Sequence, residues 1–226
     1  MPGKRVEEES VWKNGFLFVG NHLTLDFLNT QPVQRGQPME LLADFAALLG
    51  WFQAAGLLNP REVARLDRQW GQSATARATL EEMLGLREKL RKWVLAWEER
   101  RTVYDSTIEE LSRLMGAYPM RARLKKTNGR GLSTELYFKP QSPEDLFAPL
   151  AYAAAMLFSN TNHDRVRKCD QCVLHFLDTS KKGTRRWCSM HLCGNRLKVA
   201  AYATRQRWAS VGVRIKSSDA PAYTVR

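Results

Sequence analysis

The sequence lacks the long apolar runs of a membrane protein and the leader of an exported one. Its longest apolar stretch, 146–158, has 13 residues, whereas a membrane-spanning helix needs about 20. The first residues include Lys4, Arg5 and the acidic run 7–9, and they contain no apolar signal-peptide core. We therefore expect a cytoplasmic protein that contacts no membrane and whose cysteines stay reduced.

The common motifs of catalysis are also missing. The sequence contains no glycine-rich phosphate-binding loop, no nucleophile elbow and no HExxH motif. No acid and base are paired at a recognisable spacing. We therefore predict that the protein is not an enzyme. An enzyme with its pocket in the helical part of the chain is the least favoured of the functions we consider.

Cysteine is absent from most of the chain and concentrated in one short segment. Four cysteines occur as Cys-x2-Cys, a gap of 15 residues, and Cys-x4-Cys. The first pair has the spacing of a zinc knuckle. Four thiolates at about 2.3 Å close a tetrahedral zinc site and leave no position for water, so the site is structural. We predict one structural Zn²⁺ bound by Cys169, Cys172, Cys188 and Cys193.

Three alternatives to this zinc site were compared. A thioredoxin-like Cys-x2-Cys would leave the second pair unused and lacks the βαβ setting. Two disulfides are disfavoured by the expected compartment. His191 could replace Cys193, because Cys188-x2-His191 is also a ligand spacing. We favour the four-cysteine set and expect no metal role for His22, His163 or His175.

The positive charge of the chain gathers around these cysteines. The net charge is +12. Residues 165–216 hold 13 Lys and Arg against two acidic residues, whereas residues 1–164 hold 21 against 20. A metal with four thiolates carries a net charge of −2, so the segment remains strongly basic. A basic module on a nearly neutral body indicates binding to a polyanion.

The hydrophobic pattern of the remaining chain predicts a mainly α fold. We expect an orthogonal helical domain with a β-hairpin, followed by a small treble-clef-like zinc finger that ends in a basic helix. The expected helices cover about 39–55, 60–70, 74–101, 106–118 and 143–158, and the expected hairpin covers 121–125 and 132–138. Asn59, Ser73, Ser106 and Ser142 are the predicted helix caps. Tryptophans at helical spacing are expected in the core.

The predicted organisation has four parts. They are a flexible leader at 1–15, a helical sensing domain at 16–160, the zinc finger at 165–210 and a tail at 211–226. Inside the finger, 175–178 could form a short hairpin with 185–187, and Ser189 is placed to cap a helix that holds Cys193. Asp26, Asn29 and Thr30 are expected to fix the opening turn of the helical domain by hydrogen bonds, rather than to line a pocket.

Two motifs resemble a known family. The residues Arg185–Met190 and Cys193–Arg196, which follow a Cys-x2-Cys, resemble the CGNR zinc finger. The sequence Leu25–Thr30 resembles the LDFxNT opening of the helical ABATE domain, which precedes the finger in that family. Together the motifs bracket about 16–208. The resemblance implies a bacterial, DNA-binding transcriptional regulator that responds to stress or a ligand. It also assigns zinc to the four cysteines, with His191 where a small residue is expected.

The segment after Cys193 predicts a basic helix held by the zinc site. Such a helix can bind duplex DNA, with Lys and Arg on phosphates and a few side chains on base edges. Asn195 is expected to have a structural role near the start of the helix. The expected DNA contacts are Lys181, Lys182, Arg185 and Arg186 before the helix, and Arg196, Lys198, Arg205 and Arg207 within it.

Double-stranded DNA is therefore the expected partner, and the protein is expected at the nucleoid when bound. The helical domain is expected to sense a small-molecule effector or a stress signal, although no ligand-binding residue is predicted. A homodimer is a further hypothesis, because one small module buries only about 600–1,000 Å² on DNA. The alternative function is a protein- or RNA-interaction adaptor in which the zinc module is a scaffold.

Overall fold

The computed structural model describes residues 11–34, 36–127, 129 and 131–194. The helices in this part are α1 (Leu23–Leu28), α2 (Phe45–Ala54), α3 (Pro60–Trp70), α4 (Ala74–Arg100), α5 (Asp105–Ala117) and α6 (Phe147–Asn160). Short helical turns lie at Pro143–Leu146, His163–Arg165 and Met190–Gly194. The structure therefore confirms the mainly α fold. The predicted basic helix after Cys193 lies outside the described residues.

The strands form four antiparallel hairpins and no larger sheet in the described part of the chain. They are β1 (Trp12–Lys13) with β2 (Phe16–Leu17), β3 (Val33–Gln34) with β4 (Gln37–Pro38), β5 (Arg121–Lys126) with β6 (Leu132–Tyr137), and β7 (Val166–Lys168) with β8 (His175–Leu177). The leader was expected to extend to residue 15, whereas β1 already pairs with β2 at residues 12–13.

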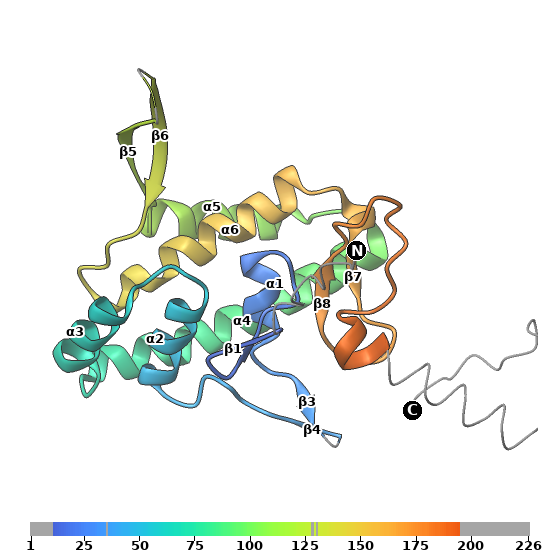
Figure 1. The fold of residues 1–226 in the computed structure, drawn as a ribbon, viewed down its shortest axis with the longest axis horizontal. Coiled ribbons are helices and arrows are strands. Elements are labelled where there is room, and N and C mark those ends of the chain that lie inside the picture. The colour runs from blue at the N-terminus through green and yellow to red at the C-terminus, as the bar shows by residue number, and fades with distance from the viewer. Residues whose placement is uncertain (1–10, 35, 128, 130, 195–226) are drawn as a thin grey trace, which may run out of the picture.

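Helix α4 is the long central element of the helical body (Figure 1). It contacts α1 and α2, and α6 in turn contacts α1 and α5. Trp51 is completely buried, Trp70 and Trp97 are buried, and Trp93 packs on the same core. These tryptophans are core residues, as predicted. Within the described residues, no helix is long and apolar enough to cross a membrane.

The helix boundaries follow the capping residues. The Asn59 side chain accepts a hydrogen bond from the Glu62 N–H, and the Glu62 carboxylate accepts one from the Asn59 N–H, which is the capping box that opens α3. Ser73 caps α4 through the Ala76 N–H, as predicted. The prediction for α2 was wrong by six residues, because Asp44 caps that helix. The Ser106 cap was also wrong, since α5 begins at Asp105 after Tyr104.

One partly buried ion pair fixes the segment after α1 against α4. The guanidinium of Arg87 donates to the Glu40 carboxylate at 2.7 Å and to the Thr30 hydroxyl at 2.9 Å. Burial of the Glu40 carboxyl would raise its pKa, but the hydrogen bond from Arg87 lowers the pKa below its ordinary value. Arg87 is only 2% exposed, so this charge depends on its partners.

Candidate metal centre and its junction with the helical domain

The first cysteine pair sits in the turn of the β7–β8 hairpin. β7 and β8 pair antiparallel, and the Cys169 N–H donates to the Leu174 carbonyl at 2.9 Å. This closes a tight turn that carries Cys169 and Cys172. The expected pairing of 175–178 with 185–187 was wrong. β8 pairs instead with β7, because the chain before Cys169 is already extended and supplies the neighbouring strand.

The second cysteine pair flanks the start of a helical turn. The Ser189 hydroxyl accepts from the His191 N–H at 3.1 Å, and the Ser189 carbonyl accepts from the Cys193 N–H at 3.0 Å. Cys188 therefore precedes the turn Met190–Gly194 and Cys193 lies inside it, as predicted. The side chain of His191 is exposed.

The four thiols meet at one point. Their Sγ atoms all lie within 4.8 Å of one another, and His191 is not part of this group. Cys188 Sγ is 3.7 Å from both Cys172 Sγ and Cys193 Sγ. A tetrahedron with bonds of about 2.3 Å has sulfur atoms about 3.8 Å apart. The donor set and spacing therefore fit the one structural Zn²⁺ that is the cofactor of this chain.

The packed thiols have opposing pKa shifts. Hydrogen bonds from the Cys172, Cys188 and Cys193 thiols to Cys169 hold its pKa below the ordinary thiol value. The hydrogen bond between Cys188 and Cys169 raises the pKa of the Cys188 thiol, because Cys188 is the proton donor in that bond. Four thiolates this close repel one another, so a divalent cation is needed to hold them all ionised.

The loop between β8 and Cys188 is held by its own hydrogen bonds. The Asp178 carboxylate accepts from the Ser180 N–H at 2.9 Å and from the Arg185 N–H at 2.8 Å. Burial would raise the pKa of Asp178, but these bonds lower it below its usual value. The Arg165 guanidinium donates to the Ser180 carbonyl at 2.6 Å. The loop is therefore fixed at both ends.

The predicted DNA contacts before the helix divide into two groups. Lys181 and Lys182 are exposed at the loop. In contrast, the Arg185 guanidinium donates to the carbonyl oxygens of Trp187 and Cys188 and lies over the Phe176 ring. Arg186 pairs with the Asp170 carboxylate at 2.6 Å. The remaining predicted contacts, Arg196, Lys198, Arg205 and Arg207, lie outside the described residues.

The apolar core of the finger includes residues from the other end of the chain. Leu174, Phe176 and the buried cysteines pack with Leu17 and Val19. The Leu177 N–H also donates to the Gly20 carbonyl at 2.8 Å. Gly20 also lies close to the backbone of α1. A Cβ at position 20 would be only 2.7 Å from the Asp26 backbone nitrogen, so this position requires glycine. The segment before α1 thus completes the finger.

Asn29 makes the most specific contact of this junction. Its amide NH₂ donates to the His175 carbonyl and its amide oxygen accepts from the His175 N–H, both at 2.9 Å. The side chain therefore replaces a neighbouring strand at the edge of β8. Asp26 accepts from the Gly20 N–H, and the Thr30 hydroxyl donates to the Phe27 carbonyl. All three residues have structural roles, as predicted, but the partner of Asn29 was not foreseen.

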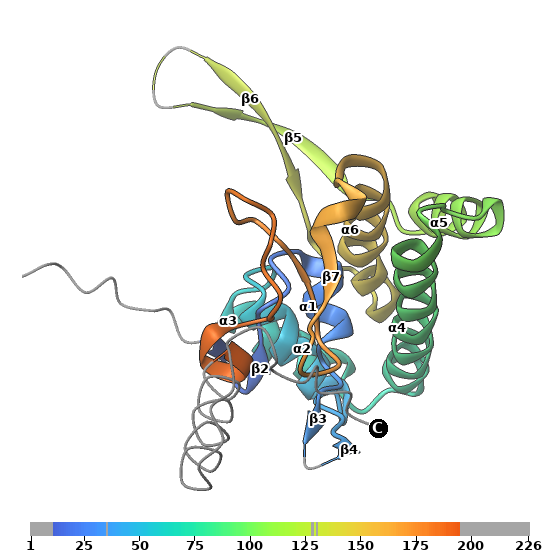
Figure 2. The ribbon, with the colours of Figure 1, turned by 90° about the vertical axis from the view of Figure 1, so that its right-hand side faces the viewer.

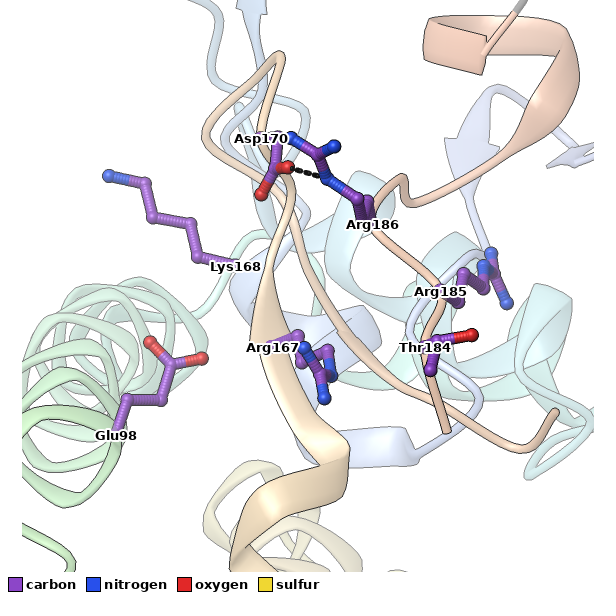
Figure 3. A pocket seen from close by; sticks show the side chains of 7 residues that line it. All are labelled: Glu98, Arg167, Lys168, Asp170, Thr184, Arg185 and Arg186. Atoms are coloured by element: carbon purple, nitrogen blue, oxygen red, sulfur yellow. Dashed lines mark hydrogen bonds and ion pairs between the residues drawn. The ribbon is translucent and has the colours of Figure 1, made fainter. Parts of the chain in front are cut away.

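A cleft of about 470 Å³ separates α4 from the finger (Figure 3). Its lining consists of Glu98, Arg167, Lys168, Asp170, Thr184, Arg185 and Arg186. The lining residue Glu98 places its Oε2 atom 3.6 Å from Nε2 of buried His175. Lys168 is exposed and has no ion pair among the described residues. Among the described residues, the Lys168 ammonium is therefore not neutralised by a carboxylate, whereas Arg186 is paired with Asp170.

The residues that connect the helical domain with the zinc finger were not predicted from the sequence. His175, Glu98 and Arg167 received no role, although Arg167 donates to the Gly183 carbonyl at 2.9 Å and braces the loop. The His163 ring donates to the Trp97 carbonyl at 2.6 Å, which ties the end of α4 to the start of the finger. No local sequence pattern predicts these contacts, because the two residues of each contact are far apart in the sequence.

Comparisons with protein families agree with this architecture. Residues 21–160 match the ABATE model, described as "Putative stress-induced transcription regulator". Residues 165–206 match the CGNR zinc finger model. No curated protein matches the chain. Neither matched model describes an enzyme family.

Proposed function

Because the chain belongs to the ABATE family and carries a CGNR zinc finger, we propose that it is a zinc-dependent, DNA-binding transcriptional regulator. The ligands of its zinc ion are Cys169, Cys172, Cys188 and Cys193. The observation that carries the proposal is the concentration of charge, with 13 Lys and Arg against two acids in residues 165–216. A segment with this excess attracts a polyanion.

The exposed lysines of the finger are the DNA contacts we propose in the described chain. Lys181 and Lys182 are exposed on a loop that is anchored at both ends, so they present charge at a fixed place. We assign Arg185 to bracing the zinc loop, since its guanidinium already binds carbonyl oxygens. Lys168, an exposed residue that lines the cleft between α4 and the finger, is an additional proposed phosphate contact. Arg196, Lys198, Arg205 and Arg207 remain proposed DNA contacts on the ground of their charge alone, since they lie outside the described residues.

Regulation by the helical domain forms the second part of the proposal. Helix α1 contacts α4, α6 and β8. A stress signal or small effector that alters packing in the helical body would therefore shift α1 against β8. Because β8 follows Cys169 and Cys172 in the same hairpin, this shift would also move the first pair of zinc ligands. We further propose a bacterial, cytoplasmic and non-enzymatic protein, since reduced thiols suit that compartment.

A preference for duplex DNA is the test of this function. The zinc-loaded protein is titrated onto a duplex and onto single-stranded RNA of the same sequence, and a random duplex pool is then selected for tight binders. A regulator binds the duplex more tightly and enriches one sequence. Preference for RNA, or no binding to either, would instead favour the adaptor, in which the zinc module only supports a protein or RNA contact.

A homodimer would give such a regulator a second half-site. A single module buries only about 600–1,000 Å² on DNA, so a second copy would enlarge the contact. Analytical ultracentrifugation with and without DNA measures the oligomeric state. A monomer under both conditions contradicts the dimer but leaves DNA binding by one chain intact.

A further inference from the structure

The β5–β6 hairpin projects from the helical body (Figures 1 and 2). All six residues of β5 are exposed. The side chain of Leu124 is 70% exposed, that of Leu132 is 65% exposed and that of Leu136 is 42% exposed. A two-stranded hairpin by itself is only marginally stable in water. An exposed ribbon with three leucines therefore indicates a surface that a partner covers.

The register of the hairpin separates its side chains onto two faces. Arg121 pairs with Tyr137, Arg123 with Glu135, and Lys125 with Ser133. These residues share one face, because alternate residues of a strand point to the same side. The opposite face holds Ala122, Leu124, Lys126, Leu132, Thr134 and Leu136. One face is therefore polar and charged, and the other is apolar with a lysine near the tip.

The charge of the ribbon decides which partner fits. Its strands carry four cationic side chains and a single acid, Glu135, which is 3.2 Å from Arg123 and 3.7 Å from Lys125. Arg121 and Lys126 have no ion pair among the described residues. Two copies joined through the apolar face would bring together two ribbons of the same charge, which is unfavourable. A polyanion would neutralise them.

We propose that the β5–β6 hairpin is a second DNA-binding element, an arm that lies in a groove of duplex DNA. The proposal rests on the DNA-binding function proposed above. A two-stranded ribbon fits the major groove. Cations at the ribbon edges bind phosphates, and apolar side chains contact sugars and base edges, as in other groove-binding ribbons.

The position of the hairpin extends the DNA footprint beyond the finger. In Figure 1 it leaves the body near α5 and α6, whereas the finger strands β7 and β8 lie at the other end. In Figure 2 the hairpin and the loop of the finger extend to the same side of the helices. Six residues of strand reach about 20 Å. The arm would therefore contact a separate segment of the duplex.

The test removes charge from the hairpin without disturbing its ion pairs. The variant Arg121→Gln/Lys126→Gln is compared with the wild type and with Arg61→Gln/Arg68→Gln, which removes two exposed charges from α3. Each zinc-loaded full-length protein is titrated onto random duplex DNA at several salt concentrations. We expect the slope of log affinity against log salt to become shallower by about 2 in the hairpin variant and to stay unchanged in the α3 variant.

A second variant tests the apolar face. We expect Leu124→Ser/Leu132→Ser to weaken DNA binding and to keep the wild-type oligomeric state, zinc content and helical circular dichroism. Equal salt slopes in the hairpin and α3 variants would overturn the proposal. So would a wild-type dimer that the leucine variant dissociates, since a second copy would then cover this face. If the wild type itself does not bind DNA, the proposed function fails, and the arm fails with it.

Discussion

At the scale of single residues, Asn29 joins two parts of the chain that lie 146 positions apart. Its side chain is 1% exposed and forms both of its bonds with the backbone of His175. Asn29 belongs to the sequence by which the ABATE domain was recognised. The structure gives that motif a physical meaning, because it shows one motif residue holding the strand that follows the first zinc-ligand pair.

Replacing Asn29 by Ala should loosen the zinc finger. The change leaves the buried His175 N–H and C=O without partners, and each unsatisfied group costs about 1–3 kcal/mol. We expect faster zinc release to a chelator, measured with a colorimetric zinc indicator. The matched control is Thr30→Val, because Thr30 is equally buried but bonds only within the helical domain. Equal zinc release from both variants would show that Asn29 does not act on the finger.

The buried carboxyl of Asp26 should make stability depend on pH. Burial raises its pKa to about 7, against opposing hydrogen bonds such as that from the Gly20 N–H. The folded chain thus holds the proton more tightly than the unfolded chain. The free energy of unfolding should therefore fall as pH rises from about 4 to 7, by about 4 kcal/mol from this group.

The variant Asp26→Asn isolates this effect, since its amide oxygen can still accept from the Gly20 N–H. Urea unfolding of both proteins at pH 5 and pH 7.5 gives the comparison. We expect the wild type to lose more stability than the variant over this interval. A parallel pH dependence in the two proteins would mean that Asp26 titrates normally.

At the scale of elements, the finger and the opening of the helical domain form one structural unit. Leu17 and Val19 belong to the finger core, and Gly20 accepts the hydrogen bond from β8. Zinc binding supplies roughly 10–16 kcal/mol in comparable small modules, so its loss should release this unit. The effect of zinc should therefore extend beyond the finger.

Hydrogen exchange with and without zinc can detect this extension. On chelation we expect loss of protection at Leu177 and at Phe18, whose N–H donates to the Val11 carbonyl in the adjoining hairpin. Amides in the middle of α3 should keep their protection. If exchange accelerates only between 166 and 194, the finger is an independent module.

The ion pair between Arg87 and Glu40 should support the helical body. Arg87→Met keeps most of the side-chain volume but leaves the Glu40 carboxylate and the Thr30 hydroxyl without this donor. We expect a loss of about 1–3 kcal/mol in the free energy of unfolding, because the partly buried Glu40 carboxylate and the buried Thr30 hydroxyl lose a charged donor. Lys89→Met is a control, because its pair with Glu110 is largely exposed. Similar losses in both variants would contradict the account.

Elements with local signals were predictable from the sequence. The capping residues Asn59 and Ser73 predicted the starts of α3 and α4. The glycine-containing turn sequence predicted the β5–β6 hairpin, and the cysteine spacing predicted the zinc site. Elements that depend on distant partners were not. The pairing of β8 with β7 and its contact with Asn29 arise from tertiary packing, which no local pattern encodes.

At the scale of the whole molecule, charge and metal are placed at one end of the chain. The basic excess lies in residues 165–216, which include the four cysteines. The helical body is nearly neutral by comparison. This asymmetry, together with the family to which the chain belongs, makes zinc-dependent DNA binding the central claim.

The measurement that tests this claim most directly is a salt titration of DNA binding. The zinc-loaded protein and its Cys172→Ser variant are titrated onto random duplex DNA at several salt concentrations. We expect tight binding by the wild type, a slope of log affinity against log salt of about −4 or steeper, and a large loss of affinity in the variant. Negligible affinity at low salt in a protein that retains its zinc would contradict this claim.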